Sequence, residues 1–257
     1  MRKRLAGSAV AVVAVLVLSS GIFVLAAAPQ GDANAAAPDL TGIWRRARRA
    51  PDNAHKYNFH EISGTLTNEE PPMTPWGEAK FKAAKPNIGR RGVPISQSND
   101  PVTKCFPPGV PRVYEMRVGQ PFEIMQVPGR VIMFFEYDHL VRQIFTDGRE
   151  HTKDLIPSYM GDSIGRWEGD TLVVDTVGFA PGFLNTPVRN SDKLHVVERF
   201  SLDPGKMALT RSYTAEDSVY LKGKYTGSDT VFPADASYNP GKCEELNFID
   251  YSKQQKH

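Results

Sequence analysis

The chain has 257 residues with 31 Lys and Arg against 29 Asp and Glu, which gives a formal net charge of +2. Residues 1–37 hold three of the basic side chains and one acid, so residues 38–257 carry 28 charges of each sign. A neutral chain lacks the positive field that attracts nucleic acid, and we expect no nucleic-acid partner. We interpret the dense basic run from Arg45 to Arg49 as a solvated edge or loop.

The segment 1–37 has the three-part layout of a signal peptide. Arg2-Lys-Arg4 precedes an apolar run from Ala9 to Ala28, and small residues lead from Ala33 to Ala37. We expect cleavage near Pro38, and a periplasmic or secreted protein that does not associate with the membrane afterwards. The alternative is a retained membrane anchor, because about twenty apolar residues are enough to span a bilayer.

Residues 38–257 are numerous enough to bury a sizeable core, and we expect them to form a single β-barrel domain. We divide it into a proline-rich arm at 51–120, a hairpin meander at 121–230 and a C-terminal tail at 231–257. Long irregular segments within a domain tend to be covers or binding loops. We therefore expect the arm to lie across the barrel mouth.

One short helix is predicted inside the proline-rich arm. Thr74 can cap it, Pro75 suits its first position, and Pro86 stops it after Lys85. The other prolines of the arm are too closely spaced for a further long element.

Alternating apolar and polar residues between Gly and Pro turns predict eight or nine strands. Their short and regular spacing favours an antiparallel meander barrel of about eight strands, with little helix. The predicted strands are Leu40–Arg45, Phe122–Val127, Arg130–Tyr137, Leu140–Thr146, Asp162–Trp167, Thr171–Val177, Leu194–Leu202, Met207–Tyr213 and Val219–Tyr225.

Five motifs resemble those of a family of uncharacterised exported bacterial proteins. They are Asn99–Arg112, Phe135–His139, Thr146–Arg149, Asp162–Phe179 and Leu194–Phe200. The resemblance spans most of residues 38–257 and implies export and a mostly β domain, without an activity. After Gly178 the chain departs from the family pattern, because Phe179–Asn190 stands where an Asn-rich, Trp-containing loop is usual. A ligand that contacts this loop would then differ from that of the family.

A second resemblance concerns Thr41-Gly-Ile-Trp44, which is similar to the Gly-x-Trp pattern on the first strand of lipocalins. It implies a lipocalin-like barrel in which the Trp plugs one end.

The two cysteines, Cys105 and Cys243, are expected to form one disulfide, because the compartment outside the cytoplasm is oxidising. The alternative is a Cys nucleophile, which would need a His nearby.

Charged residues that share a strand face with apolar ones are the candidate catalytic groups. Arg142 shares a face with Leu140 and Ile144, and an enclosed Arg needs an acidic partner, for which Glu136 is the candidate. The pair has two interpretations, an ion pair that closes the barrel or a clamp for a substrate carboxylate.

Asp175 is the second unusual position, because it shares a face with Val173 and Val177. It either faces solvent, pairs with Arg166, or transfers protons together with His195 or His139. We predict no metal site at Asp192, His195 and Glu198, because a spacing of three residues alternates faces in a strand. The sequence has no phosphate-cradling or dinucleotide motif, and we expect no cofactor.

We expect an exported binding protein whose barrel encloses a hydrophobic or aromatic small molecule. The first alternative is a cofactor-independent isomerase, lyase or hydrolase that uses Asp175, His195, Glu136 and Arg142 in the interior. The second is an interaction module of the cell envelope. The sequence leaves the oligomeric state open. The candidate ligand-binding residues are Tyr137, His139, Trp167, Phe179 and Phe183.

Overall fold

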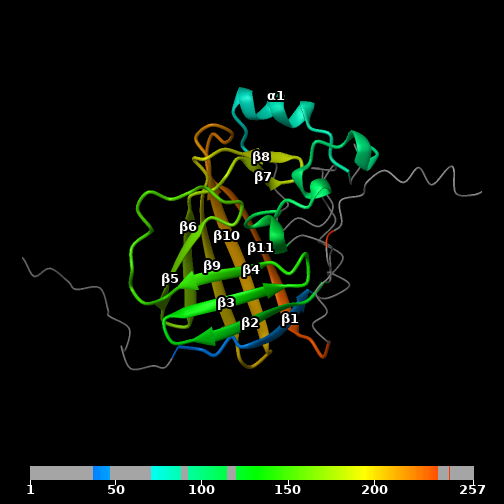
Figure 1. Cartoon of the computed structure of the whole chain (residues 1–257). Helices are drawn as coiled ribbons and strands as arrows, with labels where there is room; N and C mark the ends of the chain where they lie inside the picture. The colour runs from blue at the N-terminus through cyan, green and yellow to red at the C-terminus, as the bar shows by residue number, and fades with distance from the viewer. Residues whose placement is uncertain (1–36, 47–70, 88–91, 115–119, 237–242, 244–257) are drawn as a thin grey trace, which may run out of the picture. The chain divides into compact units, whose positions relative to one another are not determined.

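The computed structural model describes residues 37–46, 71–87, 92–114, 120–236 and 243, all within one compact unit, Asn34–His257. Nine of its strands close into a barrel in the order β1-β11-β10-β9-β6-β5-β4-β3-β2, and β7 and β8 form a separate two-stranded sheet (Figure 1). The strands are β1 (Gly42–Arg46), β2 (Phe122–Val127), β3 (Arg130–Phe135), β4 (Val141–Phe145), β5 (Asp162–Glu168), β6 (Thr171–Val177), β7 (Gly182–Asn185), β8 (Val188–Asn190), β9 (His195–Asp203), β10 (Ala208–Glu216) and β11 (Tyr225–Pro233).

The predicted class, a mostly β closed barrel with one α-helix, is confirmed, but the barrel is mixed and has nine strands. β4 and β5 pair in parallel, through Ile144 with Ser163 and Phe145 with Ile164. A tight turn can join only antiparallel neighbours, whereas a parallel pair needs a long crossover. Residues 146–161 supply that crossover, so the chain here is not a simple meander.

The strand predicted at Val219–Tyr225 is wrong, because β11 begins only at Tyr225 and continues to Pro233. The preceding segment is held as a turn by Asp217, whose carboxylate accepts the backbone N–H groups of Val219 and Tyr220 at 2.9 and 3.1 Å. This local side-chain bond competes successfully with the strand pattern. As a result β11 extends past position 230, into the segment expected to be a tail.

The predicted helix is confirmed as α1 (Pro75–Ala83). The Thr74 hydroxyl caps it by accepting from the backbone N–H of Gly77 at 3.0 Å, and Pro75 takes the first turn as expected. Short 3₁₀ turns follow at Ile95–Gln97, Pro101–Lys104 and Arg112–Tyr114. α1 contacts β8, and Figure 1 shows α1 and the β7–β8 hairpin together at one end of the barrel.

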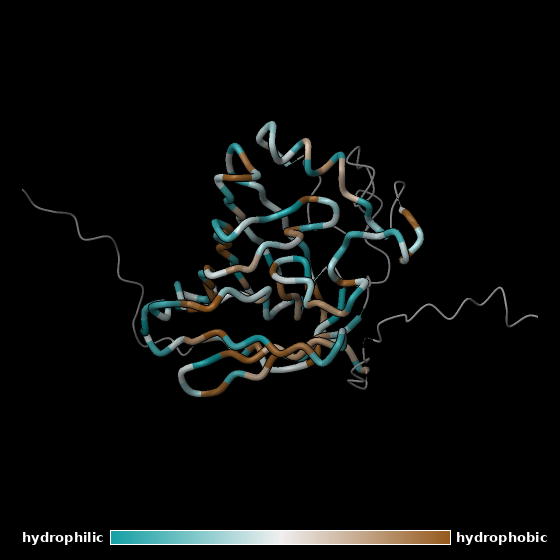
Figure 2. The backbone as a smooth tube through the Cα atoms, turned by 45° about the horizontal axis from the view of Figure 1, so that its top comes forward, coloured by the Kyte–Doolittle hydropathy of each residue, from teal (hydrophilic) through white to brown (hydrophobic). Residues whose placement is uncertain are grey.

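The barrel core follows from the two-residue alternation of buried positions along its strands. Figure 2 shows where hydrophobic residues lie along the backbone. Inward side chains such as Ile124, Met133, Leu172, Phe200 and Leu209 are fully buried. Trp44 is also buried, and its indole N–H donates to the Leu40 carbonyl at 2.8 Å. These side chains belong to one hydrophobic cluster inside the barrel.

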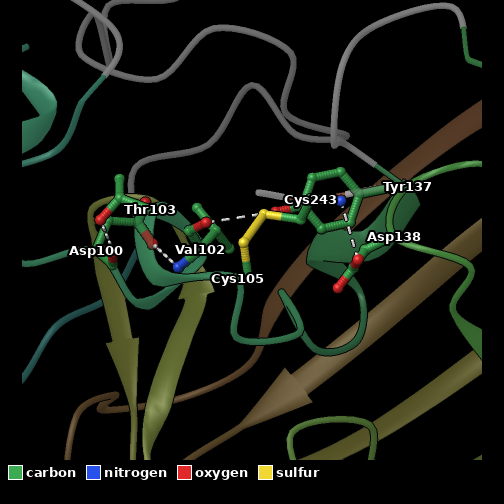
Figure 3. The surroundings of a disulfide bond; sticks show 7 residues. All are labelled: Asp100, Val102, Thr103, Cys105, Tyr137, Asp138 and Cys243. Carbon is green, nitrogen blue, oxygen red and sulfur yellow. Dashed lines mark hydrogen bonds between the residues drawn. A yellow bond between two sulfur atoms is a disulfide. The ribbon is translucent and has the colours of Figure 1, made fainter. Parts of the chain in front are cut away.

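The predicted disulfide between Cys105 and Cys243 is confirmed, with Cα atoms 5.6 Å apart. Figure 3 shows its surroundings, where the Cys243 backbone N–H donates to the Asp138 carboxylate at 3.0 Å. The Tyr137 hydroxyl reaches the Val102 carbonyl at 3.5 Å. The disulfide therefore joins position 243 to the 3₁₀ turn beside the β3–β4 connection. Among the described helices, none is both long and apolar enough to cross a membrane.

Candidate functional site

The centre of the barrel holds a buried ion pair between Arg142 of β4 and Glu198 of β9. Their side chains are 1% and 2% exposed. Nη1 of Arg142 donates to Oε1 of Glu198 at 3.0 Å, and Nη2 donates to Oε2. A bidentate pair with further hydrogen bonds is the arrangement in which two charges tolerate burial.

Three hydroxyl groups complete the surroundings of Arg142. Ser163 accepts from Nε and Nη2 at 3.3 and 3.1 Å, Thr176 from Nη2 at 3.0 Å, and Tyr114 from Nη1 at 2.6 Å. Burial raises the pKa of the Tyr114 hydroxyl and outweighs the opposing charge of Arg142, so the phenol stays neutral. All five N–H donors of Arg142 have acceptors within this cluster, which leaves none for a substrate.

A second inward pair joins Arg211 of β10 to Asp229, which lies opposite it on β11. Nε and Nη2 of Arg211 donate to Asp229 at 2.7 and 2.5 Å, and Nε of Arg46 adds a third bond at 2.9 Å. Burial by itself would raise the pKa of Asp229, but the charge and hydrogen bonds of Arg211, assisted by Arg46, lower it. The Arg211 guanidinium also covers the rings of Tyr114 and Phe122, 4.4 and 5.1 Å from their centroids.

The outer face of the barrel carries a different group of side chains. Oδ1 of Asp175 lies 2.9 Å from Nε2 of His195 and 3.2 Å from Nε2 of His151. The other ring nitrogen of His151, Nδ1, lies 2.9 Å from Oδ2 of Asp162. We call these four residues the His–Asp cluster.

Strand alternation explains three members of the cluster. Asp162, Asp175 and His195 stand on the outer face of β5, β6 and β9, because the residue that follows each of them in the chain is buried inside. The fourth, His151, comes from the crossover 146–161. That crossover is fastened to the end of β6, since the Ser158 N–H donates to the Gly178 carbonyl at 3.0 Å.

The cluster is accessible from solvent. Side-chain exposure is 16% at Asp162, 24% at His151, 32% at Asp175 and 38% at His195. Exposure thus increases along the chain of contacts, and His195 is the member that a solute reaches most easily.

The hydrogen-bond partners of Asp175 indicate which ring nitrogens of the two histidines carry hydrogen. An ionised carboxylate only accepts, so Asp175 is satisfied when both Nε2 atoms carry hydrogen. His195 then has an unprotonated Nδ1 in its neutral form, and no described residue hydrogen-bonds this atom. In that tautomer the Asp175 carboxylate holds the His195 ring in place and leaves Nδ1 able to accept a proton. His151 lies between two carboxylates, with Nε2 on Asp175 and Nδ1 on Asp162.

Of the four candidate catalytic residues, the structure brings together Asp175 and His195. Arg142 points into the barrel, on the opposite side of the wall, and its partner is Glu198, where Glu136 was expected. Glu136 lies at the end of β3 and lines a small cavity. Asp175 is on the outer face, as one of its interpretations had it, and contacts His195 and not Arg166, which pairs with Glu168 at 2.6 Å. The interior position is wrong.

The five candidate ligand-binding residues do not share one pocket in the described part of the chain. Tyr137 and Glu136 line the same cavity. The volume of this cavity is about 20 Å³, roughly the space of one water molecule. His139 is exposed in the β3–β4 turn. Trp167 packs against the core, and Phe179 and Phe183 are 1% and 4% exposed. Whether the expected arm covers the barrel mouth depends partly on 51–70, which lies outside the described residues.

Sequence reasoning missed His151, Asp162 and Glu198 as members of these clusters. Alternation predicted that Glu198 and His195 lie on opposite faces of the strand, which is confirmed, but it revealed neither the inner face nor the partner of Glu198. His151 lies in an irregular segment, where no periodicity indicates which way a side chain points. The contacts span 11 to 56 residues in sequence, so only the closed barrel brings them together.

No group of three or more His, Cys, Asp or Glu side chains in the described residues has the geometry to hold a metal ion. Comparisons with protein-family models, with curated proteins and with solved structures find no match to this chain.

Proposed function

We propose that this protein is an exported, cofactor-independent enzyme that transfers protons, with His195 as general base and Asp175 as the group that orients it. The reaction class is that of an isomerase, lyase or hydrolase. The observation that carries the proposal is the 2.9 Å contact between Oδ1 of Asp175 and Nε2 of His195 on a solvent-accessible face. An imidazole held by a carboxylate is a common proton-transfer arrangement.

The geometry supports a simple sequence of steps. Nδ1 of His195 accepts a proton from a carbon acid, a hydroxyl group or a water molecule of the substrate complex. The imidazolium that forms is stabilised by Asp175, which accepts the Nε2 hydrogen throughout. The same imidazolium then returns the proton to the product, so no external acid or oxidant is consumed. General-base catalysis of this kind contributes about 10²- to 10⁴-fold in rate.

His151 and Asp162 assist by fixing Asp175. Without another donor, the carboxylate of Asp175 would be free to rotate about its last side-chain bond. The contact of His151 at 3.2 Å, itself anchored by Asp162 at 2.9 Å, gives the carboxylate a second fixed donor. Second contacts of this sort hold catalytic groups in productive geometry.

The outer face suits this role better than the barrel interior. The interior groups Arg142 and Asp229 are engaged with neighbouring side chains, although Nη1 of Arg211 has no partner among the described residues, and the cavity beside Tyr137 has a volume of about 20 Å³. A hydrophobic molecule enclosed as in a lipocalin would need a cavity of about 300 Å³ or more. We therefore place substrate binding on the outer face of the barrel.

Export agrees with two features of the molecule. The Cys105–Cys243 disulfide is of the kind that persists in oxidising compartments. The signal-like segment 1–37 has the expected layout for transport across the inner membrane. We propose a periplasmic or secreted location on these grounds.

The test is an untargeted activity screen. The purified disulfide-bonded protein is incubated with a soluble metabolite extract in D₂O, and mass spectrometry records the compounds that gain deuterium or disappear. We expect at least one compound to change with the wild type, and the change to slow at least about 100-fold with His195→Gln or Asp175→Asn. Asp192→Asn, an exposed carboxylate paired with Lys193, is the matched control. If the two cluster variants match the wild-type rate on that compound, the proposal is wrong.

A further inference from the structure

Glu216 occupies a position beside the proposed base that the proton-transfer steps do not use. It lies directly opposite His195 in the antiparallel pairing of β10 with β9. Both residues face outward, because Ala215 and Val196 beside them are fully buried. Directly opposite residues of an antiparallel pair have Cβ atoms about 4.5–5.5 Å apart. A small substrate can therefore contact the Glu216 carboxylate and the His195 ring at the same time.

The two charged side chains next to His195 on β6 and β10 are both carboxylates. Asp175 and Glu216 flank it, and Glu216 is exposed and forms no ion pair with another described residue. The cations on the same strand or just before it are already paired, Arg199 with Glu168 at 2.9 Å and Lys193 with Asp192 at 3.1 Å. A solute that approaches the His195 ring therefore meets two carboxylates and no uncommitted cation from β9.

Apolar surface adjoins these carboxylates. Val197 is half-buried on the same face of β9, opposite Asp175, and Val177 is half-buried on β6, opposite Asp162. Methyl groups beside a carboxylate provide contact for the alkyl substituents of an ammonium group.

We propose that Glu216 determines substrate specificity, by selecting compounds that carry a primary or quaternary ammonium group near the proton that His195 removes. This rests on the proposed function of His195. Glu216 acts on recognition and takes no proton. Its removal should weaken binding of cationic compounds, while neutral compounds bind as before.

The experiment follows the ring resonances of His195 by two-dimensional ¹H–¹⁵N NMR at about 10 mM salt, where charge interactions are little screened. Choline is titrated against its neutral isostere 3,3-dimethyl-1-butanol. We expect choline to shift the His195 signals with a Kd at least about five-fold below that of the alcohol. Glu216→Gln should abolish this difference, whereas Asp192→Asn, with the same change of charge nearby, should retain it.

Three results would overturn the inference: equal affinity for the two compounds, a preference that survives Glu216→Gln, or no saturable shift with choline. Failure of the proposed function is recognised separately, since it appears as unchanged turnover in His195→Gln during the metabolite screen. His195→Gln itself serves to assign the ring signals.

Discussion

The buried pair between Arg142 and Glu198 allows the most detailed prediction about stability. Glu198→Gln keeps the size of the side chain and removes its charge, which leaves the Arg142 guanidinium buried with three neutral hydroxyl partners, Ser163, Thr176 and Tyr114. Removing one partner of a buried ion pair costs about 3–5 kcal/mol. Both side chains are at most 2% exposed, so solvent screening does not reduce this figure appreciably.

The assay is urea unfolding followed by circular dichroism, with the disulfide intact. We expect Glu198→Gln to lower the free energy of unfolding by about 3–5 kcal/mol, which is a large share of the 5–15 kcal/mol typical of a domain. The double variant Arg142→Met with Glu198→Gln removes the orphaned charge and should be less destabilised than Glu198→Gln alone. If the single variant loses less than about 1 kcal/mol, the charge of Glu198 is not needed to hold Arg142 in the interior.

Three further predictions concern other parts of the barrel. Folding lowers the pKa of Asp229, so the ionised carboxylate stabilises the fold above the unfolded-state pKa near 3.8, and this contribution is lost as pH falls through the folded value. The difference in unfolding free energy between wild type and Asp229→Asn should therefore shrink below about pH 4. A difference that stays constant with pH would contradict this. Replacing Cys105 and Cys243 by Ser opens a loop of 138 residues and should cost up to about 5 kcal/mol in urea unfolding, with no loss refuting a structural role. Gly77→Ala places a Cβ against the Tyr220 carbonyl oxygen and should cost about 1–3 kcal/mol, whereas Gly223→Ala, where nothing lies within 4 Å, should cost less than about 1 kcal/mol.

Local pattern predicted most of the barrel strands. β2 and β6 have the expected bounds, and α1 begins where Thr74 and Pro75 indicated, because capping and alternation depend on neighbouring residues alone. The parallel pairing of β4 with β5 could not be predicted in this way. It depends on the path of the crossover 146–161, which has no periodicity.

The site was predictable only in part for the same reason. Alternation identified Asp175 and Arg142 as unusual positions, and both have charged or polar partners. It did not reveal on which side of the wall each lies, because that depends on which face of the sheet closes inward. Arg142 was matched to Glu136 by proximity in sequence, whereas its partner Glu198 is 56 residues away and comes close only across the barrel.

The tautomer of the neutral His195 ring, measured by ¹⁵N NMR, shows directly whether Asp175 orients this base. We expect Nε2 to carry the hydrogen and Nδ1 to be unprotonated, because Asp175 accepts from Nε2 at 2.9 Å. Asp175→Asn should abolish this preference. A wild-type ring protonated at Nδ1, or a tautomer mixture that Asp175→Asn leaves unchanged, would contradict the assignment of His195 as the oriented base.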